Sequence, residues 1–454
     1  MLDKTSLTEY AKRERASFES ALKEFVEIPS VSADPARAGD VRKCAELACD
    51  TIRKFGGEAE MFETAGHPIV HGRFKSGKGD PTVTIYNHLD VQPASRETEP
   101  WKTDPFRFTK VGDRYFGRGT TDDKGPALSA LWGMRAAREA GVPVNVNVLW
   151  ELEEEIGSPS FEAAITKNAK QLKTDHVIVS DTIWVSRTRP ACPAGLRGLQ
   201  GFSLSLEVGE TDQHSGVTGG AARNPIGELM KLVTQMYDAQ TGQVKIKGFY
   251  DDVEKPSRKE LADFRKSGFS VAQFKKDHLF KSIRTNNALE VMKRIWALPT
   301  FEVHGLVGGY TGPGIKTIIP PRAEVKISCR LVPNQDPKKI IDLVLKFVGK
   351  NNPDVTIETE NSMYPYLAPT TGPLADAVKG AMKFAFGREP VFVREGGSIG
   401  AVNSMEKVLK CPVIFLGLSL PEHGYHAPNE NYDWQQASGG MVAFAKYFEN
   451  VSTL

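Results

Sequence analysis

The sequence predicts an α/β protein in which a mixed, mostly parallel sheet flanked by helices is interrupted by a smaller α+β domain. Three observations support this prediction. Short β-rich runs alternate with amphipathic helical patterns in both outer parts of the chain, which is typical of a parallel sheet. Between residues 198 and 367, longer alternating strands form a pattern of their own. The chain has 454 residues, a length that favours two domains over a single core.

The larger domain is expected to be discontinuous, formed by residues 1–197 and 368–454. Its strands are short runs of β-branched and other apolar residues, and its helices carry apolar residues at helical spacing. We expect strands at 81–87, 142–150, 176–180 and 412–418, and helices at 6–27, at 37–55, directly after residue 125 and around 373–386.

The smaller domain is expected to comprise residues 198–367. Apolar residues alternate in 202–208 and 322–331, which indicates strands with one buried face. We expect further strands at 301–306 and 355–357, and helices at 224–239 and 336–350. Residues 245–300 are rich in lysine and mixed in pattern, which indicates a helical insertion.

The composition excludes several classes of protein. Hydrophobic residues make up 40% and charged residues 25%, and the formal charge of +2 is small for this length. Neither a nucleic-acid partner nor a membrane surface is therefore expected. Five scattered cysteines favour a reducing compartment over a disulfide framework. The first residues lack an apolar signal core, so we expect a cytoplasmic protein.

The chain is organised around a glycine-rich loop, residues 117–125, with the sequence Gly-Arg-Gly-Thr-Thr-Asp-Asp-Lys-Gly. It holds the carboxylate pair Asp122 and Asp123 directly before a helical pattern, where the positive end of the helix dipole favours acidic groups. Taken alone, the pair is more simply interpreted as a solvated loop with an aspartate cap. The remaining polar clusters reverse that preference.

Further metal-binding residue types follow the predicted strands. His88 and Asp90 follow the first strand, the glutamates between 151 and 155 follow the second, and Asp181 follows the third. A stretch that contains His423 and His426 follows the fourth. Each alone has a plain interpretation as a structural histidine or a solvated charge run. Functional groups of parallel sheets gather beyond the carboxyl ends of the strands, so together they indicate one site.

The residue types at this edge suit divalent cations. Histidines and carboxylates without thiolates favour a pair of zinc, manganese or cobalt ions over a structural zinc site of the cysteine type. Together the motifs resemble those of the dinuclear metallopeptidases that include carnosinase, cytosolic nonspecific dipeptidase and acetylornithine deacetylase. The resemblance covers nearly the whole chain. It is carried by His88-x-Asp90, the glycine-rich loop, Glu-Glu-x-Gly-Ser, Asp181 and His426-x-x-Asn-Glu, in the order of the family.

The resemblance implies roles for these residues. Two divalent ions per subunit would be held by His88, Asp122, Glu155, Asp181 and His426, with Asp122 between the two ions. Asp90 would orient His88, as ligating imidazoles require, and Glu154 would be the general base. His423 is the rival of His426, but only His426 has the Asn-Glu pair at the matching distance. Asp123 is expected to brace the loop.

The resemblance also implies the architecture and the substrate contacts. The larger domain would be a phosphorylase/hydrolase-like catalytic domain, and residues 198–367 would be a ferredoxin-like lid that joins two copies of the chain into a homodimer. His214 of the lid would reach the partner subunit's site and stabilise the oxyanion. The substrate would be bound by Arg330, Thr317, Ser398 and Glu395, with Arg330 as a clamp for a carboxylate.

The expected activity is hydrolysis of dipeptides. Asp181 favours this branch of the family, because deacylases and carboxypeptidases tend to carry Glu at the same ligand position. The stretches around His214, Arg330 and Ser398 also resemble the dipeptidases. Residues 421–425 depart from the branch, which leaves the side-chain preference open. The alternatives are an N-acyl-amino-acid deacylase or carboxypeptidase with the same metal centre, and a catalytically silent relative.

Overall fold

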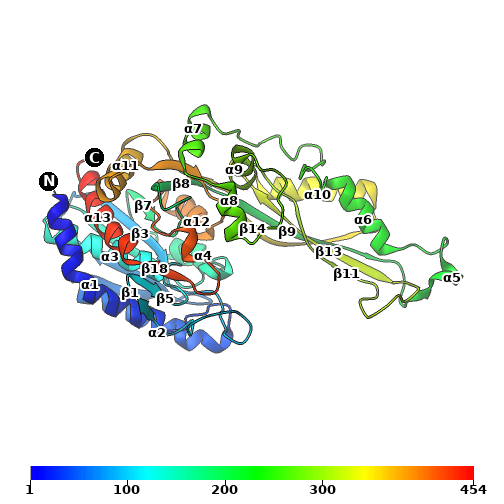
Figure 1. Cartoon of the computed structure of the whole chain (residues 1–454), viewed down its shortest axis with the longest axis horizontal. Helices are drawn as coiled ribbons and strands as arrows, with labels where there is room; N and C mark the ends of the chain where they lie inside the picture. The colour runs from blue at the N-terminus through cyan, green and yellow to red at the C-terminus, as the bar shows by residue number, and fades with distance from the viewer. Residues whose placement is uncertain (1) are drawn as a thin grey trace.

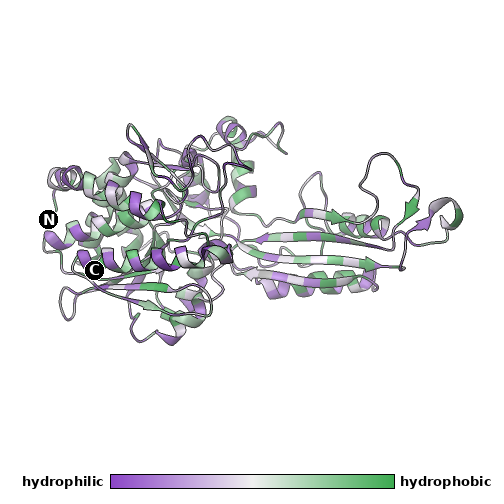
Figure 2. Ribbon diagram, turned by 90° about the horizontal axis from the view of Figure 1, so that it is seen from below, coloured by the Kyte–Doolittle hydropathy of each residue, from purple (hydrophilic) through white to green (hydrophobic). Residues whose placement is uncertain are grey.

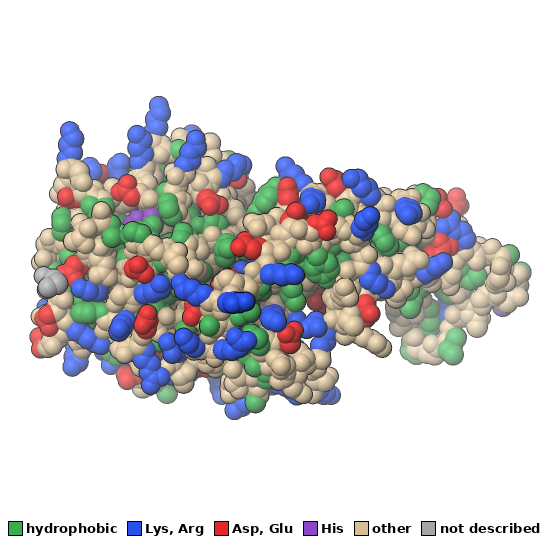
Figure 3. Space-filling model, turned by 90° about the horizontal axis from the view of Figure 1, so that it is seen from above, with side chains coloured by type: hydrophobic (Ala, Val, Ile, Leu, Met, Phe, Trp, Pro, Cys, Tyr) green, Lys and Arg blue, Asp and Glu red, His purple; other side chains and the backbone are tan. Residues whose placement is uncertain are grey.

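The computed structural model describes residues 2–454 and is elongated, with a large lobe at one end and a long sheet that extends from it (Figure 1). Both ends of the chain lie on the large lobe. No helix among these residues is long and apolar enough to cross a membrane. Positive and negative side chains both occur over the face drawn in Figure 3, so this face offers no purely basic surface to a nucleic acid.

The large lobe is built on a six-stranded mixed sheet with the order β1-β2-β6-β3-β7-β17. The inner pairs β6–β3, β3–β7 and β7–β17 are parallel, whereas β1–β2 and β2–β6 are antiparallel. The predicted mixed, mostly parallel sheet is confirmed. The strands are β1 (Glu58–Phe62), β2 (Ile69–Phe74), β3 (Thr82–His88), β6 (Asn145–Glu151), β7 (His176–Val179) and β17 (Val413–Phe415).

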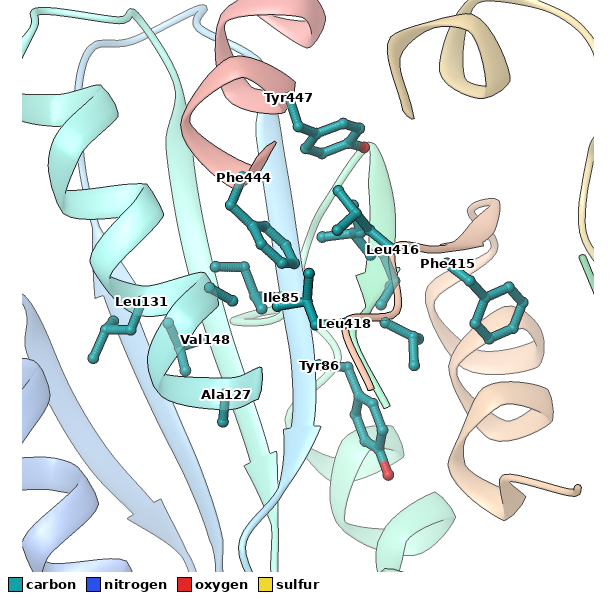
Figure 4. Close-up of a cluster of buried hydrophobic side chains, with 14 of the residues drawn as sticks. Ile85, Tyr86, Ala127, Leu131, Val148, Phe415, Leu416, Leu418, Phe444 and Tyr447 are labelled. Carbon is teal, nitrogen blue, oxygen red and sulfur yellow. The ribbon is translucent and has the colours of Figure 1, made fainter. Parts of the chain in front are cut away.

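Helices cover this sheet and bury its faces. The central one is α3 (Lys124–Glu139), which is buried from Lys124 to Met134 because it lies between the sheet and other helices. In Figure 4, Leu131 of α3 and Phe444 of α13 (Trp434–Val451) pack over Ile85 and Val148 of the sheet. This packing fixes the start of α3, which directly follows Asp122 and Asp123. The other helices of this lobe are α1 (Lys4–Val26), α2 (Ala38–Lys54), α4 (Phe161–Lys167), α11 (Pro373–Phe386), α12 (Gly400–Leu409) and α13 (Trp434–Val451).

Two small sheets complete the large lobe, and the sequence patterns did not predict them. In one, β8 (Ala191–Leu196) lies between β15 (Tyr366–Leu367) and β16 (Val391–Arg394). In the other, β5 (Arg114–Phe116) lies between β4 (Thr109–Val111) and β18 (Asn431–Asp433). The β18–β5 pairing is antiparallel and brings the C-terminal segment beside the start of the glycine-rich loop.

The smaller domain has the ferredoxin-like order βαββαβ, formed by β9, α6, β11, β13, α10 and β14. Its antiparallel sheet has the order β11-β13-β9-β14 and a hydrophobic core of its own. Burial alternates along β13, and the alternating hydropathy of these strands is visible in Figure 2. The elements are β9 (Gly198–Glu207), α6 (Pro225–Met236), β11 (Glu302–Val307), β13 (Arg322–Leu331), α10 (Pro337–Asn351) and β14 (Thr356–Met363).

The tip of this domain contains a short strand pair and a short helix, and the predicted insertion is helical. At the tip, β10 (Gln213–His214) pairs with β12 (Ile318–Ile319) and is followed by α5 (Ser215–Thr218). The insertion forms α7 (Arg258–Lys266), α8 (Val271–Asp277) and α9 (Ala288–Trp296). Phe264, Met292 and Trp296 from these helices join the core of the large lobe, and Arg394 of β16 pairs with Glu260 of α7 at 2.8 Å. The domain limits at residues 198 and 367 stay a prediction.

Candidate metal centre

Three neighbouring parallel strands bring the first polar groups together. His88 is the last residue of β3, and it is in register with Glu151, the last residue of β6. A short 3-10 turn, Glu154–Ile156, begins three residues after β6, and Asp181 follows β7. Because β3 lies between β6 and β7, the groups that follow all three strands meet at one edge of the sheet.

Asp122 lies between two histidines and contacts one with each carboxylate oxygen. Its Oδ1 is 3.0 Å from His88 Nε2, and its Oδ2 is 3.0 Å from His426 Nε2. His88 Nε2 is also 3.8 Å from Asp181 Oδ2, and His426 Nε2 is 3.1 Å from Glu155 Oε2. The five residues expected to bind metal are therefore all brought to one place.

Two overlapping groups of side chains have a geometry that suits a metal ion. Possible ligand atoms of His88, Glu154 and Asp181 all lie within 4.8 Å of one another, and so do those of His88, Asp122 and Glu155. His88, Asp122 and Asp181 are buried, whereas more than half of the His426 side chain is exposed. The centre is therefore enclosed by the sheet and open to solvent on the side of His426.

The buried carboxylates of this site favour a bound cation. Burial, together with the charges of Asp122 and Glu155, raises the pKa of Asp181 to about 7. Burial, together with Asp181 and Glu155, also holds the pKa of Glu154 well above its usual range. The two histidines favour their charged forms: hydrogen bonds to Asp122 and Asp90 hold the pKa of His88 well above its usual range against the effect of burial, and hydrogen bonds to Asp122 and Glu155 raise the pKa of His426 to about 11. In the protein alone, protonated imidazoles neutralise carboxylates that divalent cations would otherwise neutralise, so the donor set fits two such ions.

Asp90 contacts His88, which it was expected to orient, and also the turn that carries Glu154 and Glu155. His88 Nδ1 lies 3.1 Å from the backbone oxygen of Asp90 and 3.4 Å from its Oδ1. The Asp90 carboxylate also accepts hydrogen bonds from the backbone N–H groups of Glu154 and Glu155, at 3.2 and 3.1 Å, and from Ser32 Oγ at 2.6 Å. One buried carboxylate thus connects the end of β3 to the turn that carries both glutamates.

A second buried carboxylate, Glu430, shapes the glycine-rich loop. It accepts hydrogen bonds from the backbone N–H groups of Gly119, Thr121 and Asp122 and forms an ion pair with Arg118 at 2.8 Å. The sequence motif contains Glu430, but no role followed from it, because its partners lie more than 300 residues away along the chain. The residue therefore fixes the backbone that carries Asp122.

The other members of the loop have structural roles. Asp123 accepts a hydrogen bond from Asn87 Nδ2 at 2.6 Å, as expected for a brace. Gly119 has a φ of 86°, in the left-handed region that favours glycine. At Gly125 a Cβ atom would lie 2.1 Å from the Thr120 carbonyl oxygen. The loop therefore has no room for a side chain at Gly125, where α3 begins.

The structure also separates true candidates from neighbours of the same residue type. His423 is fully buried, with Nε2 3.1 Å from Asp433 Oδ2 and Nδ1 accepting from Leu420 N, so its nitrogens are used away from the site. Glu151 bonds to the hydroxyls of Tyr86 and Ser158. Its neighbour Glu153 accepts from the backbone N–H groups of His67 and Ser160. These two glutamates are buried, so the interpretation as a solvated charge run is wrong for them.

The expected substrate residues of the domain junction lie together. Arg330 Nη1 of β13 donates to Ser398 Oγ at 3.0 Å, and Ser398 Oγ donates in turn to the backbone oxygen of Arg197. Glu395 lies three residues before Ser398. Burial raises the pKa of Glu395 to about 8, with a further contribution from Asp181. Its Oε2 is buried and has no hydrogen-bond partner among residues 2–454.

His214 and Thr317 are not brought to this site by their own chain. His214 is exposed, and its Nδ1 accepts from Gly216 N at 3.0 Å. Thr317 is its neighbour, since Ser215 N donates to the Thr317 carbonyl at 3.0 Å. Helix α5, which directly follows His214, lies at the end of the smaller domain farthest from the large lobe (Figure 1).

Comparison with known proteins identifies the family of this chain. The model of peptidase family M20/M25/M40 matches residues 84–450. The chain belongs to this family. It is 32% identical to a Cys-Gly metallodipeptidase of Schizosaccharomyces pombe, over 100% of this chain and 99% of the relative. It is 28% identical to the human Beta-Ala-His dipeptidase, over 98% and 92% of the two chains. The predicted resemblance to the dipeptidase branch is confirmed.

Solved structures agree with the fold. The dipeptidase Dug1p of Saccharomyces cerevisiae superposes with a TM-score of 0.84 at 29% identity, over 100% of this chain and 99% of the other. A metallo-carboxypeptidase of the family from Sulfolobus solfataricus gives a TM-score of 0.86 at 32% identity, over 95% and 98%. Both likenesses span the catalytic lobe and the smaller domain, which from here on is called the lid.

Proposed function

We propose that this enzyme hydrolyses the peptide bond of dipeptides with the help of two divalent cations. The observation that carries the proposal is the position of Asp122, which presents one oxygen to His88 and the other to His426. A carboxylate shared in this way is what a two-ion site requires. Similarity to dipeptidases over almost the full length supports the substrate class.

The residues divide into two sets around Asp122. His88 and Asp181 would hold one ion, Glu155 and His426 the other, and Asp122 would contribute to both. Nitrogen and oxygen donors without thiolates suit zinc, manganese or cobalt. When bound, such ions lower the pKa of a water molecule and polarise a carbonyl group.

Glu154 is suited to move the proton in this reaction. Its carboxylate lies with His88 and Asp181, and its backbone is held by Asp90. The raised pKa of Glu154 makes its carboxylate a stronger base, suited to take a proton from water and later to give it to the leaving amine. Asp90 therefore acts as a positioning residue for both His88 and Glu154.

The polar groups at the domain junction suit a zwitterionic substrate. Arg330 and Ser398 would receive the substrate carboxylate, and the buried Glu395 oxygen without a partner would receive its ammonium group. A free dipeptide carries both charges, whereas an N-acyl amino acid lacks the ammonium group. This difference favours a dipeptidase over a deacylase. A carboxypeptidase is the second candidate, because the Sulfolobus enzyme is equally similar in sequence and fold.

A homodimer through the lid would complete the site. His214 and Thr317 lie at the lid tip, away from the metal residues of their own chain. Strand β11 is at the edge of the lid sheet, and its apolar side chains Leu306 and Val307 are 48% and 56% exposed. An exposed apolar edge strand is a site for association. In such a dimer, His214 of the partner subunit would stabilise the oxyanion.

The five cysteines are all free and buried, which supports the expected cytoplasmic location.

The first test is the Glu154→Gln variant with a panel of substrates. We expect the variant to bind metal as the wild type does but to lose turnover of every dipeptide, because the proton carrier is gone. Glu153→Gln is the matched control, since the adjacent Glu153 carboxylate binds backbone groups outside the site. Unchanged turnover by Glu154→Gln would exclude it as the base.

The substrate class is decided by the wild-type enzyme, stripped of metal and reloaded with zinc or manganese. Amine release is measured for free dipeptides, for N-acyl amino acids and for longer peptides. Cleavage of free dipeptides alone supports the proposal. Cleavage of N-acyl amino acids alone would replace it with a deacylase, and trimming of longer peptides from the carboxyl end would replace it with the carboxypeptidase.

A further inference from the structure

A cavity lies in the lid, outside the metal centre. Its volume is about 370 Å³, which is within the range of sites for small ligands. Its wall combines the turn after α6, part of the insertion and the segment that leads into β11. The polar members that matter are Thr241, Gln243, Arg284, Arg294, Thr300 and Glu302.

Two arginines converge in this cavity without an acidic partner. A Cβ atom built on Gly242 would lie 3.2 Å from Arg294 Nη1 and 3.4 Å from Arg284 Cζ, so both guanidinium groups approach the same point. Within residues 2–454 neither arginine forms an ion pair, and the carboxylate in the wall, Glu302, belongs to an exposed residue. Two like charges held this close are stabilised by an anion between them.

Part of the hydrogen-bonding capacity of these arginines is already used. Arg284 Nη2 donates to Tyr237 Oη at 2.7 Å and to the Ala239 carbonyl at 3.2 Å, and Arg294 Nη1 donates to the Thr241 carbonyl at 2.9 Å. These bonds brace the turn after α6. They leave several of the five N–H groups of each guanidinium free, and Arg294 Nε is buried without a partner among the described residues.

We propose that this cavity binds a small oxyanion, a phosphate or carboxylate group, between Arg284 and Arg294. Guanidinium groups bind both kinds of oxyanion through paired, charge-assisted hydrogen bonds. The hydroxyl groups of Thr241 and Thr300 in the wall offer further donors to the same ligand.

The wall of the cavity is connected to the proposed substrate clamp. Thr300 N donates to the Arg330 carbonyl at 2.9 Å, and Arg330 N donates to Thr300 Oγ1 at 3.4 Å. A bound oxyanion would order the segment that contains Thr300 and, through it, the backbone of Arg330. The expected effect is a change of KM for dipeptides; this consequence, unlike the binding itself, rests on the proposed function.

The binding is tested by titration calorimetry on the metal-loaded enzyme with inorganic sulfate, inorganic phosphate and acetate, at constant ionic strength in chloride. We expect binding to the wild type and a loss of about tenfold in affinity in both Arg284→Gln and Arg294→Gln, because each removes one charged donor set. Arg265→Gln, on the exposed face of α7, is the matched control and should bind as the wild type does. Arg294→Lys keeps the charge without the fork and should lie between.

The three anions separate the two ligand chemistries. Binding of sulfate and phosphate alone indicates a phosphate-type ligand, and binding of acetate alone indicates a carboxylate. Equal affinity in the wild type, Arg284→Gln and Arg294→Gln would overturn the proposal, and so would the absence of binding by all three anions. Loss of binding in Arg330→Gln with retention in Arg284→Gln would place the anion in the substrate site and overturn it as well.

Calorimetry decides the site without any measurement of activity. KM for a dipeptide, with and without sulfate, then tests the connection to Arg330. A change in the wild type that is absent from Arg284→Gln supports the connection, and an unchanged KM with sulfate bound refutes it. Far-ultraviolet circular dichroism confirms that each variant is folded before it is compared.

Discussion

The buried pair of Glu430 and Arg118 predicts how the enzyme responds to loss of one negative charge. Glu430→Gln keeps the shape of the side chain but leaves the Arg118 guanidinium, which is 1% exposed, without its countercharge. Removal of one partner of a buried ion pair costs about 3–5 kcal/mol. The amide nitrogen of Gln also cannot accept a hydrogen bond. It therefore loses the donors of one oxygen, either Thr121 N and Asp122 N or Gly119 N and the Arg118 side chain.

This change should reach the metal centre through the backbone. Asp122 N is among the donors to Glu430, so the variant loosens the residue placed between the two histidines. Loss of a group that orients a metal ligand typically lowers metal affinity about 10- to 100-fold. Because burial raises the pKa of Glu430 to about 7, against the lowering effect of Arg118, the comparison is made at pH 8, where the carboxylate is ionised.

Two measurements follow the change: urea unfolding by tryptophan fluorescence, and competition for metal against a coloured chelator. Glu422→Gln is the matched control, since Glu422 lies in the same C-terminal segment and pairs with the half-buried Arg187 at 2.7 Å. An ion pair of that exposure contributes less than about 1 kcal/mol. If Glu430→Gln lost no more stability than Glu422→Gln, the buried contacts of Glu430 would not stabilise the fold. If it lost stability but kept its metal affinity, Glu430 would not position Asp122.

Four further outcomes are expected. Dialysis against a chelator should abolish activity and lower the thermal midpoint, and manganese or zinc should restore both. His426→Ala should weaken one of two metal-binding steps in a competition titration and leave the other. Mixing Glu154→Gln with His214→Ala, each inactive or slow alone, should restore up to about a quarter of wild-type activity if His214 acts across a dimer; no recovery after subunit exchange would argue against that role. Burial lowers the pKa of His176 in the folded protein to about 4, so below pH 6.5 the unfolded chain takes up a proton at this residue before the folded protein does. The free energy of unfolding should therefore drop by about 2 kcal/mol between pH 8 and pH 5. His176→Gln should lack this part of the pH dependence.

Much of the fold and of the candidate site follows from local sequence signals. The strands that end near His88 and Asp181 are short β-rich runs, and the edge of a parallel sheet brings the residues after them together. The choice of His426 over His423 depended on the spacing to Asn429 and Glu430, and the contacts of His426 with Asp122 and Glu155 agree with it.

Other features depend on contacts that no local pattern reveals. Strand β1 is a short edge strand with two glutamates and only one buried residue, Phe62, and it therefore gives little signal. The role of Glu430 requires a loop more than 300 residues earlier in the chain. The packing of the insertion on the large lobe rests on Phe264, Met292 and Trp296, whereas the lysine-rich, mixed sequence of this segment indicates helices but not the surface that they cover.

That packing limits how the two parts of the enzyme can move. A domain joined only by the two neighbouring strands β9 and β14 could rotate about that junction as a rigid body. Here the chain leaves the lid again before α7 and returns after α9, and the ion pair between Glu260 and Arg394 fastens the excursion to the large lobe. The lid is therefore anchored at separated points rather than along one axis. Opening by a wide rotation of the whole lid would separate these apolar side chains from the core of the large lobe, so the packing opposes such a movement.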